Sequence, residues 1–418
     1  MAQGVRKGTI FNILGQYGAA FFIFLFQIIA ARFLGPSQFG LLSLLYSLIM
    51  TFKIVLSSGA RDTLMKNIPY YQAIGDEEAL NTVYKKSTLI FSILAGLFLL
   101  ISLSLSQPIS LKLFDDNLIL LFEFILGVLL LSSFRFFLSI VEGRREFHLV
   151  SLFLVSHRIF LLIGIIIGLM IEKSAVSTGA GIALSPVIPL LILLVLTFSR
   201  NWFSISGKQK PIKGLELFII EISLLNFFGM FLLRLGPLML KLLGGENANF
   251  YNGLYNAIFM PLNLMRGILI ALFMSLFPNI SRAFGEKNKE QIKRYIRKST
   301  FIVLYVIISV SLVFLLWGPA IVKLLYGKSY EVQRLDCILL SLMIGFYMFA
   351  RLINRILVAG GKYRVSLFSV IGSLLVAIIA VVLLEMSPMI RVELSLLAGT
   401  FFYAVSQAYY LFFKSNFL

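Results

Sequence analysis

The sequence has few of the groups on which soluble enzymes and secreted proteins depend. It has one cysteine, Cys337, two histidines, and only 13% charged residues in a chain of 418. A single cysteine excludes an intramolecular disulfide, and neither histidine has a cysteine or carboxylate at the spacing of zinc ligands. The sequence also lacks a phosphate-binding loop and a clear Ser-His-Asp arrangement. We therefore predict no metal site, no cofactor and no enzymatic activity.

Hydrophobic residues make up 59% of the chain. Ordinary soluble domains carry about 25% charged residues, so this composition indicates a membrane protein. A spanning helix needs roughly 20 apolar residues, and twelve segments qualify. We predict an all-α polytopic membrane protein of about 12 transmembrane helices, the first of them retained rather than cleaved. The predicted spans begin near Thr9, Phe39, Thr88, Leu118, Leu149, Thr178, Glu216, Tyr251, Ser299, Leu335, Val365 and Glu393.

The second half of the chain repeats short sequences of the first half. The segment from Ala73 resembles the segment from Ala283, which lies 210 residues later. LGPSQFGLL, from Leu34, has a counterpart 209 residues on, and VSLFLV, from Val150, has one 215 residues on. Three matches in the same order indicate duplication of an ancestral half, as in many transporters. We predict an amino-terminal lobe (1–199), a cytoplasmic linker (200–215) and a carboxyl-terminal lobe (216–418), with six spans in each lobe.

Basic residues are unevenly distributed between the loops. The chain has 37 Lys and Arg against 19 Asp and Glu, which gives a formal net charge of +18. Most loop cations fall in the amino terminus, the even-numbered loops and the carboxyl tail, which the positive-inside rule places in the cytoplasm. We therefore expect both termini to be cytoplasmic and the basic loops to contact anionic lipids. This asymmetry accounts for the net charge, so no nucleic acid partner is predicted.

Eight basic residues lie inside the predicted spans. Each costs roughly 2.5–3.5 kcal/mol at the bilayer centre on the insertion scale. Only Glu123 and Glu221 lie well inside spans as acidic partners. Arg135, Lys241 and Arg355 lie near span ends, where a long side chain reaches the headgroups. The remaining positive charge requires water or an anion.

The in-span cations predict a hydrated cationic cavity between the lobes that binds phosphate or diphosphate. Guanidinium groups match phosphate oxygens with several donors in a fork. Arg351 and Arg355 are four residues apart and therefore share one helix face, where like charges repel unless an anion lies between them. The candidate substrate-binding residues are Lys53, Arg158, Arg234, Arg266, Arg351, Asn354 and Arg355.

Four segments carry a resemblance to a known family. They are ARFLGPSQFG from Ala31, LFPNISRAFGEKNKEQIKRY from Leu276, KLLYGKSY from Lys323 and ILVAGGKYR from Ile356. These segments resemble landmarks of the polysaccharide transporter, or oligosaccharide flippase, family of the multidrug/oligosaccharidyl-lipid/polysaccharide flippase superfamily. The resemblance implies two six-helix lobes in a prokaryotic plasma membrane. Relatives often carry an Asp in span 7, where this sequence has Arg234, which puts carboxylate-based ion coupling in doubt.

The expected function is a flippase that moves an anionic polyprenyl-diphosphate-linked oligosaccharide from the cytoplasmic to the outer leaflet by alternating access. Its expected partners are the lipid-linked oligosaccharide, membrane lipids and other glycan-assembly proteins. One alternative is an exporter of amphiphilic drugs of the same superfamily, which the sign of the charge disfavours. Others are a membrane-embedded glycosyltransferase or ligase, which would normally carry a sizeable external loop, and a glycan-assembly scaffold.

Overall fold

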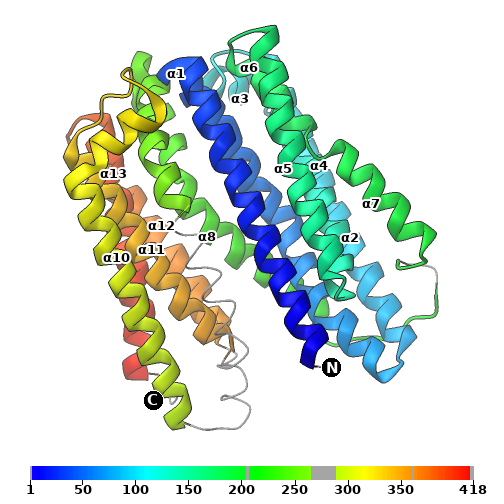
Figure 1. Cartoon of the computed structure of the whole chain (residues 1–418). Coiled ribbons are helices and arrows are strands. Elements are labelled where there is room, and N and C mark those ends of the chain that lie inside the picture. The colour runs from blue at the N-terminus through cyan, green and yellow to red at the C-terminus, as the bar shows by residue number, and fades with distance from the viewer. Residues whose placement is uncertain (1, 204–206, 265–288, 360–361, 415–418) are drawn as a thin grey trace. The chain divides into compact units, whose positions relative to one another are not determined.

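The computed structural model describes residues 2–203, 207–264, 289–359 and 362–414, and these residues are almost entirely helical (Figure 1). No β-strand occurs among them. Within this part of the chain, ten helical stretches are long and apolar enough to cross a membrane. The protein is therefore an all-helical, multi-pass membrane protein, as predicted.

Every predicted span begins within a helix. The long helix α1 contains the first two spans, α6 and α7 together form the sixth, and the eighth begins in the helical segment 248–264. The first half comprises α1 (Ala2–Ile74), α2 (Glu77–Ser104), α3 (Ser106–Leu113), α4 (Leu118–Gly143), α5 (Phe147–Ile171), α6 (Ala175–Leu184) and α7 (Val187–Ser199). The second half comprises α8 (Leu215–Leu243), η1 (Gly245–Asn247), segment 248–264, α10 (Lys289–Tyr326), α11 (Arg334–Ala359), α12 (Tyr363–Leu383), α13 (Pro388–Tyr409) and η2 (Tyr410–Lys414).

A single glycine joins the first two spans without a loop. Gly35 has φ 71° and ψ 172°, and it is the non-helical residue inside α1. This backbone region is essentially restricted to glycine. The counterpart of LGPSQFGLL begins at Leu243, the last residue of α8, and its Gly245 also has a positive φ of 56°. The repeated sequence thus marks the joint between the first and second spans of each half.

The segment Gly59–Ser87, between the second and third predicted spans, is helical except at one short turn. Helix α1 continues to Ile74 and α2 begins at Glu77. The continuation of α1 to Ile74 was not predicted, because the spans were recognised by continuous apolar runs. Here the helix is held instead by apolar residues at i, i+4 spacing. Ala60, Leu64 and Ile68 are buried in one hydrophobic cluster.

The predicted linker is hydrogen-bonded to the first turns of α2. The Asp76 carboxylate accepts the Ala79 backbone N–H at 3.0 Å, which caps α2, and it pairs with the Lys210 ammonium at 3.3 Å. These two contacts, the Ala79 bond first, hold the pKa of Asp76 below its usual value. The Thr82 hydroxyl donates to the Lys210 carbonyl at 2.8 Å and accepts the Lys210 backbone N–H at 3.1 Å.

The sixth span is broken where a proline removes a backbone hydrogen bond. Helix α6 ends at Leu184 and α7 begins at Val187, with Ser185 and Pro186 between them. The Ser185 hydroxyl lies 3.2 Å from Nε2 of His157, which is 2% exposed. The break therefore supplies a hydrogen-bond partner for a buried histidine on α5.

The chain separates into two compact units. Unit 1 contains residues 1–33 and 44–227, and unit 2 contains residues 34–43 and 228–418. The division passes through α1 and between Phe227 and Phe228 in α8. The predicted lobe boundaries, at residues 199/200 and 215/216, stay predictions.

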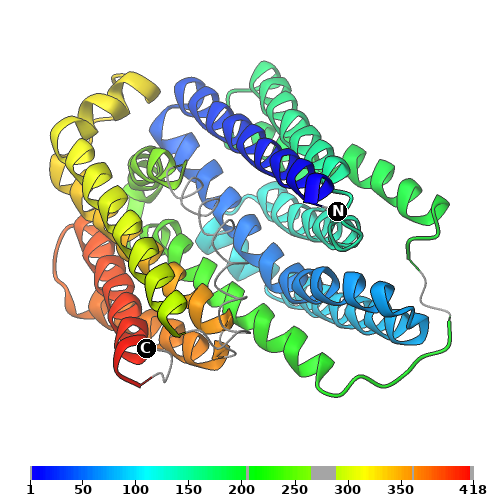
Figure 2. The same cartoon turned by 60° about the horizontal axis from the view of Figure 1, so that its bottom comes forward.

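Helices differ in how much of their apolar surface the protein covers. Only 17% of the most apolar stretch of α2 and of α10 is buried, against 78% for α1 and 72% for α11. In unit 2, α11 and α12 both pack against α13, and Figure 2 shows α12 and α13 side by side, in orange and red. Since lipid tails accept apolar side chains as readily as a protein core does, α2 and α10 present their apolar faces to lipid. Polar side chains therefore gather on inner helices such as α1, α4 and α11.

Candidate functional site

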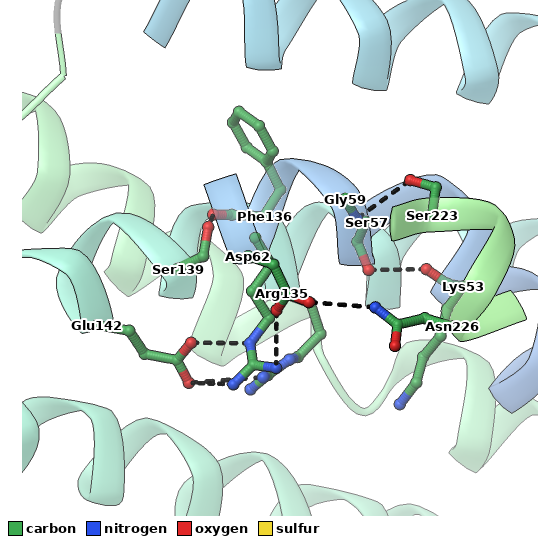
Figure 3. A network of polar contacts seen from close by, with 11 residues as sticks. Lys53, Ser57, Gly59, Asp62, Arg135, Phe136, Ser139, Glu142, Ser223 and Asn226 are labelled. Atoms are coloured by element: carbon green, nitrogen blue, oxygen red, sulfur yellow. Dashed lines mark hydrogen bonds and ion pairs between the residues drawn. The ribbon is translucent and has the colours of Figure 1, made fainter. Parts of the chain in front are cut away.

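A network of charged side chains joins α1, α4 and α8 within unit 1 (Figure 3). Glu142, near the end of α4, is 7% exposed and lies 2.9 Å from Nε of Arg61 and 3.5 Å from Nη2 of Arg135. Asp62 lies 3.7 Å from Nη1 of Arg61 and accepts the Asn226 amide at 3.1 Å. Both carboxylates are therefore engaged.

Close approach of two backbones positions this network. A Cβ at Gly59 of α1 would overlap the backbone carbonyl of Ile219 on α8, so only glycine lets the helices meet here. The Gly59 backbone N–H donates to the Ser223 hydroxyl at 3.1 Å. Asp62 and Asn226 each lie three residues further along their helices, almost one turn, which brings them into contact.

Two further cations, Lys53 of α1 and Arg158 of α5, belong to the same neighbourhood. Both, together with Arg135, act electrostatically on His157, and Arg158 also acts on Arg135. Nη1 of Arg158 is a buried donor without a hydrogen-bond acceptor in the part of the chain that the structure describes. The sequence-predicted residues Lys53 and Arg158 are thus brought together, with Arg135, which the sequence had suggested would reach the headgroups.

A second polar cluster lies in unit 2, on α11. Asn354 is 3% exposed and donates to the Tyr403 hydroxyl at 3.2 Å. Arg351 acts electrostatically on the same hydroxyl, and its Nη1 would lie 3.2 Å from a Cβ at Gly229 of α8. Arg355 has an exposed side chain one turn further on. Arg351 and Asn354 therefore both act on the Tyr403 hydroxyl, whereas the predicted pairing of Arg351 with Arg355 around an anion stays a prediction.

The remaining predicted residues have separate surroundings. Arg234, on α8, is 8% exposed and acts on the Tyr255 hydroxyl of segment 248–264. Arg266 lies outside the described residues. Within those residues, no group of three or more His, Cys, Asp or Glu side chains gathers as a metal site would require.

Sequence reasoning missed several carboxylates inside helices. It counted only Glu123 and Glu221 well inside spans. In the structure Glu142, Asp336 and Glu393 are also buried, with 8%, 5% and 0% of their surface exposed. For Glu142 a signal was available, because it follows Arg135 by seven residues, which is two helical turns.

Comparison with known proteins identifies the family. A model of the family described as polysaccharide biosynthesis protein matches residues 5–284, more than half of the chain. The chain belongs to the polysaccharide biosynthesis protein family. A protein of similar sequence is the capsular polysaccharide biosynthesis protein CapF of Staphylococcus aureus, which is 25% identical to this chain over 141 residues. That match spans 34% of this chain and 35% of CapF, about a third of each.

Solved structures of transporters share the fold of this polysaccharide biosynthesis family member. An inward-facing multidrug resistance MATE family transporter of the MOP superfamily matches with a TM-score of 0.71 at 16% identity, covering 93% of this chain and 92% of its own. A MOP superfamily transporter from Pyrococcus furiosus gives a TM-score of 0.67 at 16% identity, covering 96% and 94%. A MATE transporter from Vibrio cholerae gives 0.69 at 15% identity, covering 100% and 99%. At these identities the likeness establishes the fold alone.

Proposed function

We propose that this protein is a flippase for an anionic polyprenyl-diphosphate-linked oligosaccharide. It moves the headgroup from the cytoplasmic to the outer leaflet of a prokaryotic plasma membrane by alternating access, while the lipid tail stays in the bilayer. Both termini are cytoplasmic in this proposal. The role is transport, and it requires no catalytic step by this chain.

The buried Nη1 of Arg158, which has no hydrogen-bond acceptor among the described residues, carries the proposal. This neighbourhood of unit 1 contains four basic side chains, Lys53, Arg61, Arg135 and Arg158. Its two carboxylates, Asp62 and Glu142, already form ion pairs or hydrogen bonds. A buried charged donor without an acceptor is costly. An anionic headgroup with several oxygens would supply the missing acceptors, and diphosphate suits the fork of an arginine.

The sign of the charge separates this proposal from export of cationic amphiphilic drugs. The multidrug MATE neighbours share the fold, so the fold does not decide between the two. The Pyrococcus furiosus structure is described by the reverse polarity of its binding pocket, which suggests a different function for that protein. Pocket charge therefore varies within one fold, and a surplus of cations favours an anionic substrate. The match to CapF and the family description agree with a role in polysaccharide synthesis.

Arg158→Gln tests the proposal in liposomes that contain the full chain and a fluorescent polyprenyl-diphosphate oligosaccharide. Charge-assisted hydrogen bonds contribute about 1.5–3 kcal/mol, so flipping should fall about tenfold to a hundredfold. The thermal unfolding midpoint should stay level or rise, because the substitution removes an unsatisfied buried donor. Arg297→Gln, at an exposed arginine of α10, is the matched control and should flip normally.

Two results would contradict the proposal. One is flipping by Arg158→Gln at the rate of the unsubstituted protein. The other is efflux of a cationic dye from the same liposomes without movement of the sugar lipid, which would support the drug exporter.

A further inference from the structure

Two carboxylic side chains of unit 2 lie together in the protein interior. Asp336 is the third residue of α11 and Glu393 is the sixth residue of α13, and the two helices pack against each other. Their exposed fractions are 5% and 0%. The carboxyl groups are close enough for one to hydrogen-bond the other.

The two groups differ in the partners that they have. Asp336 accepts the backbone N–H of Gln333 at 3.0 Å. Both carboxylate oxygens of Glu393 are buried. When the group is ionised, neither oxygen accepts a hydrogen bond from any of the described residues. No basic side chain of the described residues forms an ion pair with either carboxylate. A buried carboxylate without a partner needs an explanation.

The surroundings supply few other charges. Along α11 the neighbouring Cys337 thiol interacts with both carboxyl groups, and its sulfur faces α10 at Gly318. From segment 248–264 the buried Tyr255 hydroxyl interacts with Glu393 and with Arg234 of α8, and it has no hydrogen-bond partner among the described residues. The buried face of α12 carries only serine and apolar side chains.

We propose that Asp336 and Glu393 form a proton-binding site, in which a single proton is shared between the two carboxyl groups. The neutral group donates its O–H to the ionised one, which gives Glu393 the partner that it lacks. Two carboxylates at this distance in a buried site repel strongly, and a shared proton removes one of the two charges. Loss of the proton to water leaves two anions that must separate or become hydrated. The packing of α11 on α13 at this end thus depends on the proton.

The role of this site in transport rests on the proposed function. With cytoplasmic termini, the starts of α11 and α13 lie toward the outer face of the membrane. A proton from the external medium would bind here and close this end of the helix pair, while its release to water would open it. We therefore infer that the external pH controls the flipping rate. The carboxylate that relatives often carry in span 7 is absent here, and this pair occupies a different place in the chain.

Infrared spectroscopy of the substrate-free full chain in lipid nanodiscs tests the proton-binding site by itself. At about pH 7 the unsubstituted protein should show a protonated carboxyl C=O band that shifts in D2O. Glu393→Gln and the double variant Asp336→Asn/Glu393→Gln should each lose this component. Glu123→Gln, which alters a lone buried carboxyl of α4, is the matched control and should retain it. A spectrum of the double variant equal to that of the unsubstituted protein would overturn the proposal.

A second measurement tests the role in transport. In liposomes, the flipping rate of the unsubstituted protein should change at least about fivefold between external pH 6 and pH 8. In Glu393→Gln the change should be less than about twofold. An unaltered pH response in Glu393→Gln would overturn the transport role. Absence of flipping in every sample would instead contradict the proposed function, while the infrared result would still decide whether the pair holds a proton.

Discussion

Among single residues, Glu142 is the carboxylate on which two arginines of unit 1 depend. Glu142→Gln leaves Arg61 and Arg135 without this partner. Loss of one partner from a buried ion pair costs about 3–5 kcal/mol. Because Arg61 is 31% and Arg135 19% exposed, screening should reduce the loss to about 2–3 kcal/mol. Thermal unfolding in nanodiscs should show a clearly lower midpoint.

Glu216→Gln is the control for this prediction. Glu216 pairs with Lys86 at 3.0 Å, with 46% and 37% of the two side chains exposed. Exposed pairs contribute about 0–1 kcal/mol, so the midpoint should hardly move. An equal fall of the unfolding midpoint in the two variants would show that the ion pairs of Glu142 with Arg61 and Arg135 do not stabilise the protein more than an exposed pair does.

Residue-level reasoning identified cations better than it identified their neighbours. Lys53 and Arg158 were recognisable because a charge inside an apolar run stands out in any sequence. Arg61 and Asp62 were not, because the helix that carries them extends beyond the apolar run. The meeting of Asp336 with Glu393 depends on which helices pack together, and no spacing within one helix reveals that.

Among the elements, the joint at Gly35 determines whether α1 can make two spans. Gly35→Ala should cost about 1–3 kcal/mol because alanine is strained in this backbone conformation. No atom lies within 4 Å of the added Cβ, so strain is the only expected cause. Thermal unfolding of the full chain measures the loss.

A helical glycine with equally open surroundings separates strain from any other effect of adding a methyl group. Gly96 of α2 also has no atom within 4 Å of an added Cβ. Gly96→Ala should stabilise the protein by about 0.5–1 kcal/mol, because alanine favours the helix. If both substitutions moved the unfolding midpoint in the same direction, backbone strain at Gly35 would be refuted as the cause of the loss.

The sequence predicted the number of helices well and their ends less well. A span is recognised by about 20 apolar residues, a strong signal, and every predicted span begins within a helix of the described residues. Where α1 leaves the apolar run, only one face in contact with α2 and α4 is apolar, and a search for continuous hydrophobicity does not detect it. Both the break at Pro186 and the positive φ of Gly35 required the coordinates.

For the whole molecule, the predicted orientation is testable by cysteine labelling. Lys112 of α3 and Lys208 of the linker are both exposed, and the single native Cys337 is fully buried. In intact cells, Lys112→Cys should react with a membrane-impermeant maleimide, and Lys208→Cys should react only after permeabilisation. The opposite pattern would place the termini outside.

At this scale the sequence predicted the fold class, whereas the duplication and the lobe boundaries stay predictions. The duplicated landmarks follow the order of the chain, so they place a boundary in the linker. Inside α8, the compact units separate at residues 227/228. Contacts such as that of Gly59 with α8 assign the first half of this helix to unit 1, and such contacts depend on tertiary packing.

The bonds between Lys210 and α2 have a consequence for engineering. A connector between duplicated halves is an obvious place to insert a fluorescent reporter or to divide a gene into two expressed fragments. Here the backbone at Lys210 is held from both its N–H and its C=O by one threonine. An insertion at this position would break both bonds and free the start of α2. Reporters are better placed in the turn between α10 and α11, where Lys328 and Ser329 are exposed.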